Sequence, residues 1–153
     1  MVRECVALYC DLARDWPNVF NPNLAGSLNN LSIRLSDLGH REEALEVVRE
    51  CVALYHDLAR DWPNAFNPEL GCALNNLSNR LFDLGHQEEA LEVARECVAL
   101  RHDLARDQPN VFNPVLAGSL NNLSIRLSDL GHREEALEVV RECVALRHDL
   151  ARD

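Results

Sequence analysis

The stretch LNNLSIRLSDLGHREEALEVV, residues 28–48, decides the fold of this chain because it recurs twice more almost unchanged. It belongs to a 46-residue unit that occupies 3–48, 49–94 and 95–140, and a fourth copy begins at 141. The third copy differs from the first at four pairs of positions: Tyr9/Arg101, Cys10/His102, Trp16/Gln108 and Asn23/Val115. A fixed period of this size predicts a stacked array, in which each unit completes its core against its neighbours.

The spacing of leucines predicts the first of two helices in each unit. Intervals of four and three residues are the pattern of one helix face, and in the first copy they separate Leu24, Leu28, Leu31, Leu35 and Leu38. We expect this helix to open at Asn21-Pro22, since asparagine is a good N-cap and proline suits the first turn. Gly39 is expected to end it.

A second helix is expected from about Arg41 to Asp61. Glu42 and Glu43 fall in its first turn, where the helix dipole favours negative charge. Pro63 disfavours helical geometry in the residue before it. The apolar residues of this helix form two adjacent stripes, so the helix must pack on two sides. The segment 62–67 is expected to be the loop that returns the chain to the next unit.

Together these patterns predict an all-α fold, a right-handed α-solenoid of antiparallel helix pairs. We expect a single domain over 1–153, with a half repeat at 1–21, repeats at 22–67, 68–113 and 114–153, and a longer array of which this is a part. Seven helices are expected, at 2–15, 22–38, 41–61, 68–84, 87–107, 114–130 and 133–152.

The net charge of the chain limits the kinds of partner it can bind, and the spacing of its cysteines indicates its redox compartment. The net charge of −10 argues against nucleic acid and against anionic membranes, which bind basic surfaces. No apolar run reaches the roughly 18 residues of a membrane span. The repeated cysteines at 5, 51, 97 and 143 should lie too far apart for disulfides. We therefore expect free thiols and a cytoplasmic protein.

The segment 28–48 resembles the tetratricopeptide repeat. Leu31, Ser32, Leu38-Gly39 and Glu43-Ala44 match the pattern of that family, and the two later copies match in register. The Leu-Asn-Asn-Leu signature is most similar to the longer kinesin-light-chain type of repeat, as found in arrays of NOD-like signalling proteins. The 46-residue period is longer than the family's usual 34. The resemblance implies a scaffold that binds proteins or peptides.

The same resemblance implies that the first helix of each pair lines a groove. The helix face opposite the leucines is free for this role. Its candidate residues are Asn29, Ile33, Ser36, Asn75, Asn79, Phe82, Asn121, Ile125 and Ser128. Asparagine both donates and accepts hydrogen bonds, so these side chains could hold a peptide backbone. The alternative is that stacked asparagines bond to one another. The acidic balance favours a neutral or basic segment over a phosphorylated one.

Catalysis, cofactors and metals are not expected. His56, His102 and His148 each follow a cysteine by five residues, which is a poor arrangement for activating a thiol. Three arginines recur once per repeat, each three residues before an aspartate. They are Arg34, Arg80 and Arg126, and each is expected to form a solvated ion pair within its helix. The alternative function is a structural, self-associating array, because the terminal helices carry apolar faces without polar caps.

Overall fold

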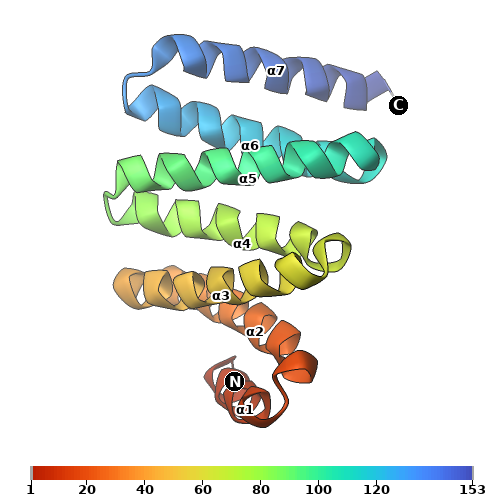
Figure 1. Cartoon of the computed structure of the whole chain (residues 1–153). Helices are drawn as coiled ribbons and strands as arrows, with labels where there is room; N and C mark the ends of the chain where they lie inside the picture. Colours follow the sequence, from red (N-terminus) through yellow and green to blue (C-terminus); the bar gives the residue numbers. More distant parts are fainter. Residues whose placement is uncertain (1, 153) are drawn as a thin grey trace.

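Residues 2–152 fold into a stack of seven antiparallel helices, and the stack runs from α1 at one end to α7 at the other (Figure 1). This computed structural model describes residues 2–152; Met1 and Asp153, the ends of the expected domain, lie outside the described residues. The helices are α1 Val2–Asp15, α2 Pro17–Asp37, α3 Arg41–Asp61, α4 Pro63–Asp83, α5 Gln87–Asp107, α6 Pro109–Asp129 and α7 Arg133–Arg152. The described residues are therefore all-α, as expected.

The first helix of each pair begins earlier than expected, so the expected loop at 62–67 is wrong. α4 begins at Pro63 rather than at 68, and only Trp62 separates it from α3. Trp62 has φ −134° and ψ 73°, the extended backbone that a following proline favours. Pro63 is the first helical residue, where a missing N–H has no cost. The second proline, Pro68, lies inside the helix.

The connection from the first helix to the second is a glycine turn, as expected. Gly39 has a φ of 83°, and Gly85 and Gly131 are alike at 82° and 84°. The N–H of His40 donates to the carbonyl oxygen of Leu35 at 2.8 Å, and the N–H of Gly39 donates to Ser36 at 3.0 Å. This is the Schellman pattern, which satisfies the last carbonyls of α2.

The core is spread along the stack and follows the leucine stripe with one exception. Leu24, Leu28, Leu31 and Leu35 are buried, whereas Leu38 is 74% exposed. Leu38 was expected in the core, but it is the C-cap residue, where the chain leaves the helical path. On α3, both expected stripes contribute buried residues, so that helix packs against α2 on one side and α4 on the other.

Buried polar groups tie the two helices of a pair together. The thiols of Cys51, Cys97 and Cys143 are buried, and each donates to a backbone carbonyl of the preceding first helix at 3.2, 3.4 and 3.3 Å. All six cysteines are free, as the spacing predicted. The Ser32 hydroxyl donates to the carbonyl of Ala44 at 2.8 Å, which satisfies a hydroxyl that would otherwise be buried at a cost.

A ladder of ion pairs on the exposed side joins consecutive second helices, α1 to α3, α3 to α5 and α5 to α7. This ladder was not predicted from the sequence. Its arginine pairs, each spanning 40 residues, are Arg3–Glu43, Arg49–Glu89 and Arg95–Glu135, and its histidine pairs are His56–Glu96 and His102–Glu142. Over residues 2–152, no helix combines the length and apolar character needed to cross a membrane.

Candidate functional site

A hollow of about 400 Å³ lies over α2 and α4, on the face opposite the leucine stripe. Four of the residues expected to line a groove line it: Asn29, Ile33, Asn75 and Asn79. Five residues that the sequence analysis did not place there also line it: Asp37, Cys72, Asn76, Arg80 and Arg101. We call this feature the α2–α4 hollow.

The other five expected residues lie outside the α2–α4 hollow. Ser36 is half-buried on α2. Phe82 is also half-buried, and the guanidinium carbon of Arg126 stacks 3.9 Å from its ring centroid, so this ring is partly covered. On α6, Asn121, Ile125 and Ser128 are exposed. The expected surface is therefore continuous in sequence register, and the α2–α4 hollow covers only its α2 and α4 part.

The asparagines of adjacent first helices are bonded to one another. Asn76 Nδ2 donates to Asn29 Oδ1 at 2.9 Å, and Asn122 Nδ2 donates to Asn75 Oδ1 at 3.1 Å. The alternative role that the sequence analysis left open for stacked asparagines is thus present. In each bond the acceptor is Oδ1, the single oxygen of the asparagine side chain. The amide nitrogens of Asn29 and Asn75 have no hydrogen-bond partner in residues 2–152, so they remain able to donate to a ligand.

The expected arginine–aspartate ladder is uniform in sequence but not in structure. Arg34 pairs with Asp37 at 3.1 Å, and both side chains are exposed. Nε of Arg80 lies 3.2 Å from a carboxylate oxygen of Asp83, an ion-pair contact without hydrogen-bond geometry, and its side chain is only 15% exposed.

For Arg126 the expectation of a solvated pair is wrong. Its guanidinium donates to Asn79 Oδ1 at 3.0 Å and stacks on Phe82 instead. Burial lowers the pKa of Arg126, although the charges of Asp129 and Asp83 oppose that shift. Sequence spacing could not find this exchange because both partners are present only in the middle repeat, where Asn79 and Phe82 replace an isoleucine and a serine.

Arg101, on α5, lines the α2–α4 hollow and was missed by the sequence reasoning. It is 8% exposed and is the one residue of α5 that lines the α2–α4 hollow. Its guanidinium donates to the hydroxyl of Ser119, to the carbonyl of Val115 at 3.4 Å and to the sulfur of Cys72 at 3.7 Å. The available signal was the change from tyrosine, at positions 9 and 55, to arginine in an otherwise similar helix.

The ionisable groups near the hollow and the residues that line it are suited to binding a ligand. Burial raises the pKa of Tyr55 to about 12 and also raises the pKa of the Cys97 thiol, so neither group ionises readily near neutral pH. In the part of the chain that the structure describes, no group of histidine, cysteine, aspartate and glutamate side chains could hold a metal ion. The hollow offers amide donors, one buried guanidinium and apolar surface, which are the elements of a polar binding site.

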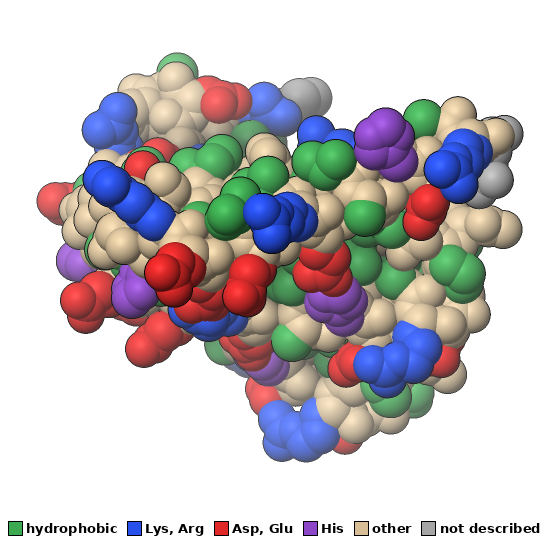
Figure 2. Space-filling model, turned by 90° about the horizontal axis from the view of Figure 1, so that it is seen from above, with side chains coloured by type: hydrophobic (Ala, Val, Ile, Leu, Met, Phe, Trp, Pro, Cys, Tyr) green, Lys and Arg blue, Asp and Glu red, His purple; other side chains and the backbone are tan. Residues whose placement is uncertain are grey.

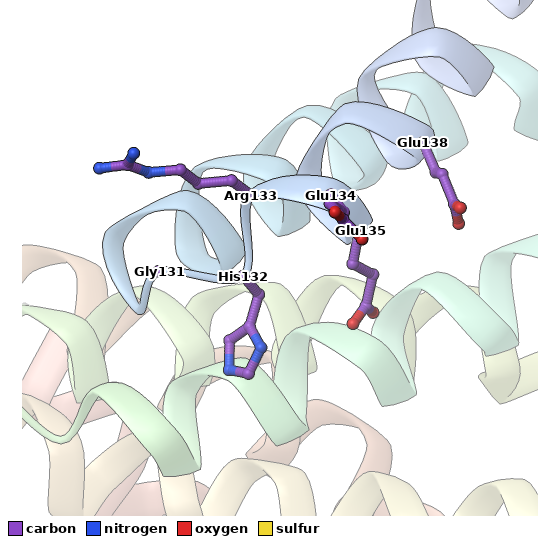
Figure 3. A pocket seen from close by; sticks show the side chains of 6 residues that line it. All are labelled: Gly131, His132, Arg133, Glu134, Glu135 and Glu138. Carbon is purple, nitrogen blue, oxygen red and sulfur yellow. The ribbon is translucent and has the colours of Figure 1, made fainter.

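A second hollow, of about 600 Å³, lies where α7 begins (Figure 3). The side chains of His132 and Glu135 point to the same side, whereas Arg133 points away from them (Figure 3). Glu135 already pairs with Arg95 of the ladder. An equivalent hollow occurs at the start of α3, around His40 and Glu43. These hollows repeat with the starts of the second helices, and one glutamate in each, Glu43 or Glu135, is already paired with an arginine of the ladder.

The stacked antiparallel pairs and the hollow over their first helices define a helical-repeat scaffold. The chain belongs to the tetratricopeptide repeat family, whose model matches residues 24–59, 73–109 and 116–151. Members of this family are generally non-catalytic scaffolds of protein–protein interaction, in line with the expectation drawn from segment 28–48. A search of curated proteins by sequence finds no match.

Solved structures share this fold at low sequence identity. A kinesin-light-chain repeat protein from Podosopora anserina, with nearly identical TPR-like repeats, is 21% identical, with a TM-score of 0.69; the match covers 99% of this chain and 70% of that one. The Rap conjugation gene regulator of the plasmid pLS20, solved in complex with the Phr peptide, is also 21% identical, with a TM-score of 0.69. That match covers 98% of this chain and 36% of the regulator.

Proposed function

We propose that this protein is a non-catalytic scaffold that binds an extended segment of a partner protein in the α2–α4 hollow. The observation that carries the proposal is that Asn29 and Asn75 both line the hollow, and that their amide nitrogens have no hydrogen-bond partner in residues 2–152 while their oxygens accept hydrogen bonds from the next first helix. A fixed carboxamide donor suits a backbone carbonyl, and an extended peptide presents one at regular intervals. The regulator of plasmid pLS20, which shares the fold, was solved with a peptide.

A library of eight-residue peptides tests this proposal. We expect binders whose affinity falls severalfold in Asn75→Ala, since a hydrogen bond is worth about 1 kcal/mol. Asn121→Ala is the matched control, because Asn121 is the same residue one repeat later and lies outside the hollow. Equal loss in both variants would contradict the assignment. So would unchanged binding in Asn75→Ala combined with loss on charge reversal at Glu46, Glu92 or Glu138, which lie on the second helices.

Self-association through α7 is the second candidate, and one observation favours it. The outer face of α7 is apolar and open: Leu137 and Val144 are each 50% exposed. Figure 2, seen from the α7 side, shows hydrophobic side chains in a row along this surface, with acidic side chains gathered to one side. Contiguous apolar patches mark interaction surfaces. Sedimentation over a range of concentrations should show a dimer that Val144→Glu disperses; a strict monomer at high concentration would refute this candidate.

A further inference from the structure

We propose that Arg101 makes the α2–α4 hollow a site for one oxyanion, a carboxylate or a phosphate, carried by the extended segment that binds there. The inference rests on the proposed peptide-binding function and adds the chemistry that the partner must carry. It also identifies the repeat that would contact the charged group of the partner.

The first argument is that the charge of Arg101 is buried without a counter-charge. The residue is 8% exposed, and no ion pair joins its guanidinium to a carboxylate in residues 2–152. Its three hydrogen-bond partners, on Ser119, Val115 and Cys72, are all neutral. A buried charge is costly unless it is paired. An oxyanion entering the hollow would supply that pair, and guanidinium groups match carboxylate and phosphate oxygens in geometry.

The second argument is that the surrounding residues are fitted to arginine. A Cβ atom on Gly71 would lie 3.3 Å from Arg101 Nε and 3.6 Å from its Cγ, a crowded approach. The equivalents of Gly71 in the other copies are Ala25 and Ala117, so this copy lacks a methyl group where the arginine passes. The hydroxyl that receives the guanidinium belongs to Ser119, and the equivalent positions are Ser27 in the first copy and Ala73 in the second. The feature particular to Arg101 is therefore the glycine that it passes, Gly71.

The position of Arg101 beside two asparagines also supports an anion site. Arg101 shares the hollow with the free amide nitrogens of Asn29 and Asn75. A backbone held by those amides would run past the guanidinium, which could then take a side-chain or terminal anion. One repeat earlier the same position is Tyr55, a neutral phenol lying against Gly26. One repeat later it is Arg147, which is exposed on α7.

Net charge alone favours a neutral or basic partner, because the chain carries −10. The local arrangement differs from that average. Asp37, the acidic residue lining the hollow, is paired with Arg34. The buried guanidinium thus faces the hollow as a positive charge without an acid of its own, and the surrounding acidic surface would disfavour highly charged partners while permitting a single anion at this point.

The test follows the side-chain Nε–Hε signal of Arg101 by NMR with ¹⁵N-arginine labelling, assigned by its absence in Arg101→Tyr. Four probes are titrated: inorganic phosphate, sodium acetate, a capped octapeptide of serine and alanine with one central glutamate, and the same peptide with glutamine. Tyrosine fills the equivalent place in α3, so Arg101→Tyr should keep the fold, which circular dichroism verifies. Arg147→Tyr is the matched control on α7.

We expect the glutamate peptide to shift the Arg101 signal saturably and to bind about tenfold more tightly than the glutamine peptide, as a charge-assisted hydrogen bond implies. Arg101→Tyr should abolish that difference, and Arg147→Tyr should not change it. Saturable binding of phosphate or acetate at Arg101, with neither peptide bound, would support the oxyanion site, would identify a free ion as its ligand, and would separately overturn the peptide-binding function.

Two results would overturn the inference. One is an Arg101 signal that none of the four probes moves saturably. The other is equal affinity of the glutamate and glutamine peptides, with the Asn75 amide signal shifting and Arg101 unaffected. The second result would leave peptide binding standing and remove only the oxyanion.

Discussion

The helices α3 and α7 have one sequence in two environments. Residues 41–60 and 133–152 are identical except that Tyr55 corresponds to Arg147. Both segments are helical from the first arginine to the last. Yet Leu45 on α3 is 9% exposed and its equivalent Leu137 is 50% exposed, because α4 covers one and no described helix covers the other. The local sequence determines the helix, and the neighbouring helix determines the burial.

This difference teaches that stability in the array is a property of interfaces between repeats. An amphipathic helix draws most of its stability from the packing of its apolar face. The same side chain should therefore be worth different free energies at the two positions, whereas strictly local features should be worth the same. Each of the four predictions below tests one side of that distinction.

The largest expected effect separates Leu45 from Leu137. Leu45→Ala removes a buried side chain under α4 and should lower the free energy of unfolding by about 2–5 kcal/mol. Leu137→Ala should cost no more than about 1 kcal/mol, since its side chain is half exposed. Urea unfolding followed by circular dichroism measures both. Equal losses would mean that α7 is covered in solution, and repeating the measurement at tenfold lower concentration would expose a dimer as the cause.

The second prediction compares equivalent thiols at the other end of the stack. Cys51 is fully buried and its burial raises the thiol pKa to about 12, whereas its equivalent Cys5 is exposed. Cys5 should react with a thiol reagent at least about a hundredfold faster, because Cys51 reacts only when the structure opens. Mass spectrometry after timed alkylation assigns each rate. Comparable rates in a protein with cooperative unfolding would contradict the packing of α3.

The third prediction concerns the glycine turns, where the same substitution should have the same effect on stability in every repeat. Gly85 and Gly131 have φ values of 82° and 84°, which other L-residues adopt at a cost. Gly85→Ala and Gly131→Ala should each destabilise by about 1–2 kcal/mol. Gly118 lies within α6 with open space around its Cβ position, so Gly118→Ala should stabilise by about 0.4–1 kcal/mol. A gain in stability for Gly85→Ala would show that the turn is not as described.

The smallest effect belongs to the ladder of ion pairs. Arg49 lowers the pKa of Glu89 through a hydrogen-bonded pair at 2.7 Å, and both side chains are more than 40% exposed. Such pairs are worth about 0.2–1 kcal/mol. Because the pKa is lowered in the folded state, the contribution is present above the ordinary pKa of glutamate and is lost as the pH falls through the lowered value.

Glu89→Gln should therefore cost stability at pH 7 and cost little at pH 3, and 1 M salt should reduce the loss at pH 7. Arg141→Gln is the control, since Arg141 is the equivalent of Arg49 on α7 and makes no ion pair in the described residues. An unchanged difference between the two variants at pH 3 and pH 7 would contradict the pKa shift.

The fold could be predicted from the sequence because its determinants are local and repeated. The leucine intervals and Gly39 specified the helix face and its end correctly. The expected starts of the second helices, at 41, 87 and 133, were correct. Those of the first helices were wrong because Pro22 looks like a first-turn residue, while Pro17, the true start, follows a tryptophan that caps nothing with its side chain. Pro22 lies in the second turn of α2, where a proline removes one i→i−4 hydrogen bond, so sequence rules alone disfavoured that placement.

The candidate site was predictable only in part because it depends on contacts between repeats. Asn29 and Asn75 could be placed on the free face from helical angle alone. The bonds from Asn76 and Asn122 and the reach of Arg101 depend on which residue lies opposite in the next helix, and the sequence of one helix does not contain that information. Comparing the copies position by position would have marked Arg101, since it differs in character from Tyr55.

The short connections between helices limit where residues can be inserted into the chain. Trp62 and Gln108 are each the single residue between a second helix and the next first helix. An insertion there would displace every helix that follows. At Gly39, Gly85 and Gly131, by contrast, the Cβ position meets nothing within 4 Å, so no neighbouring side chain packs against these points of the turns. We therefore expect added length to be tolerated best as whole repeats or at this edge of the stack, where a tag or a protease site would be placed.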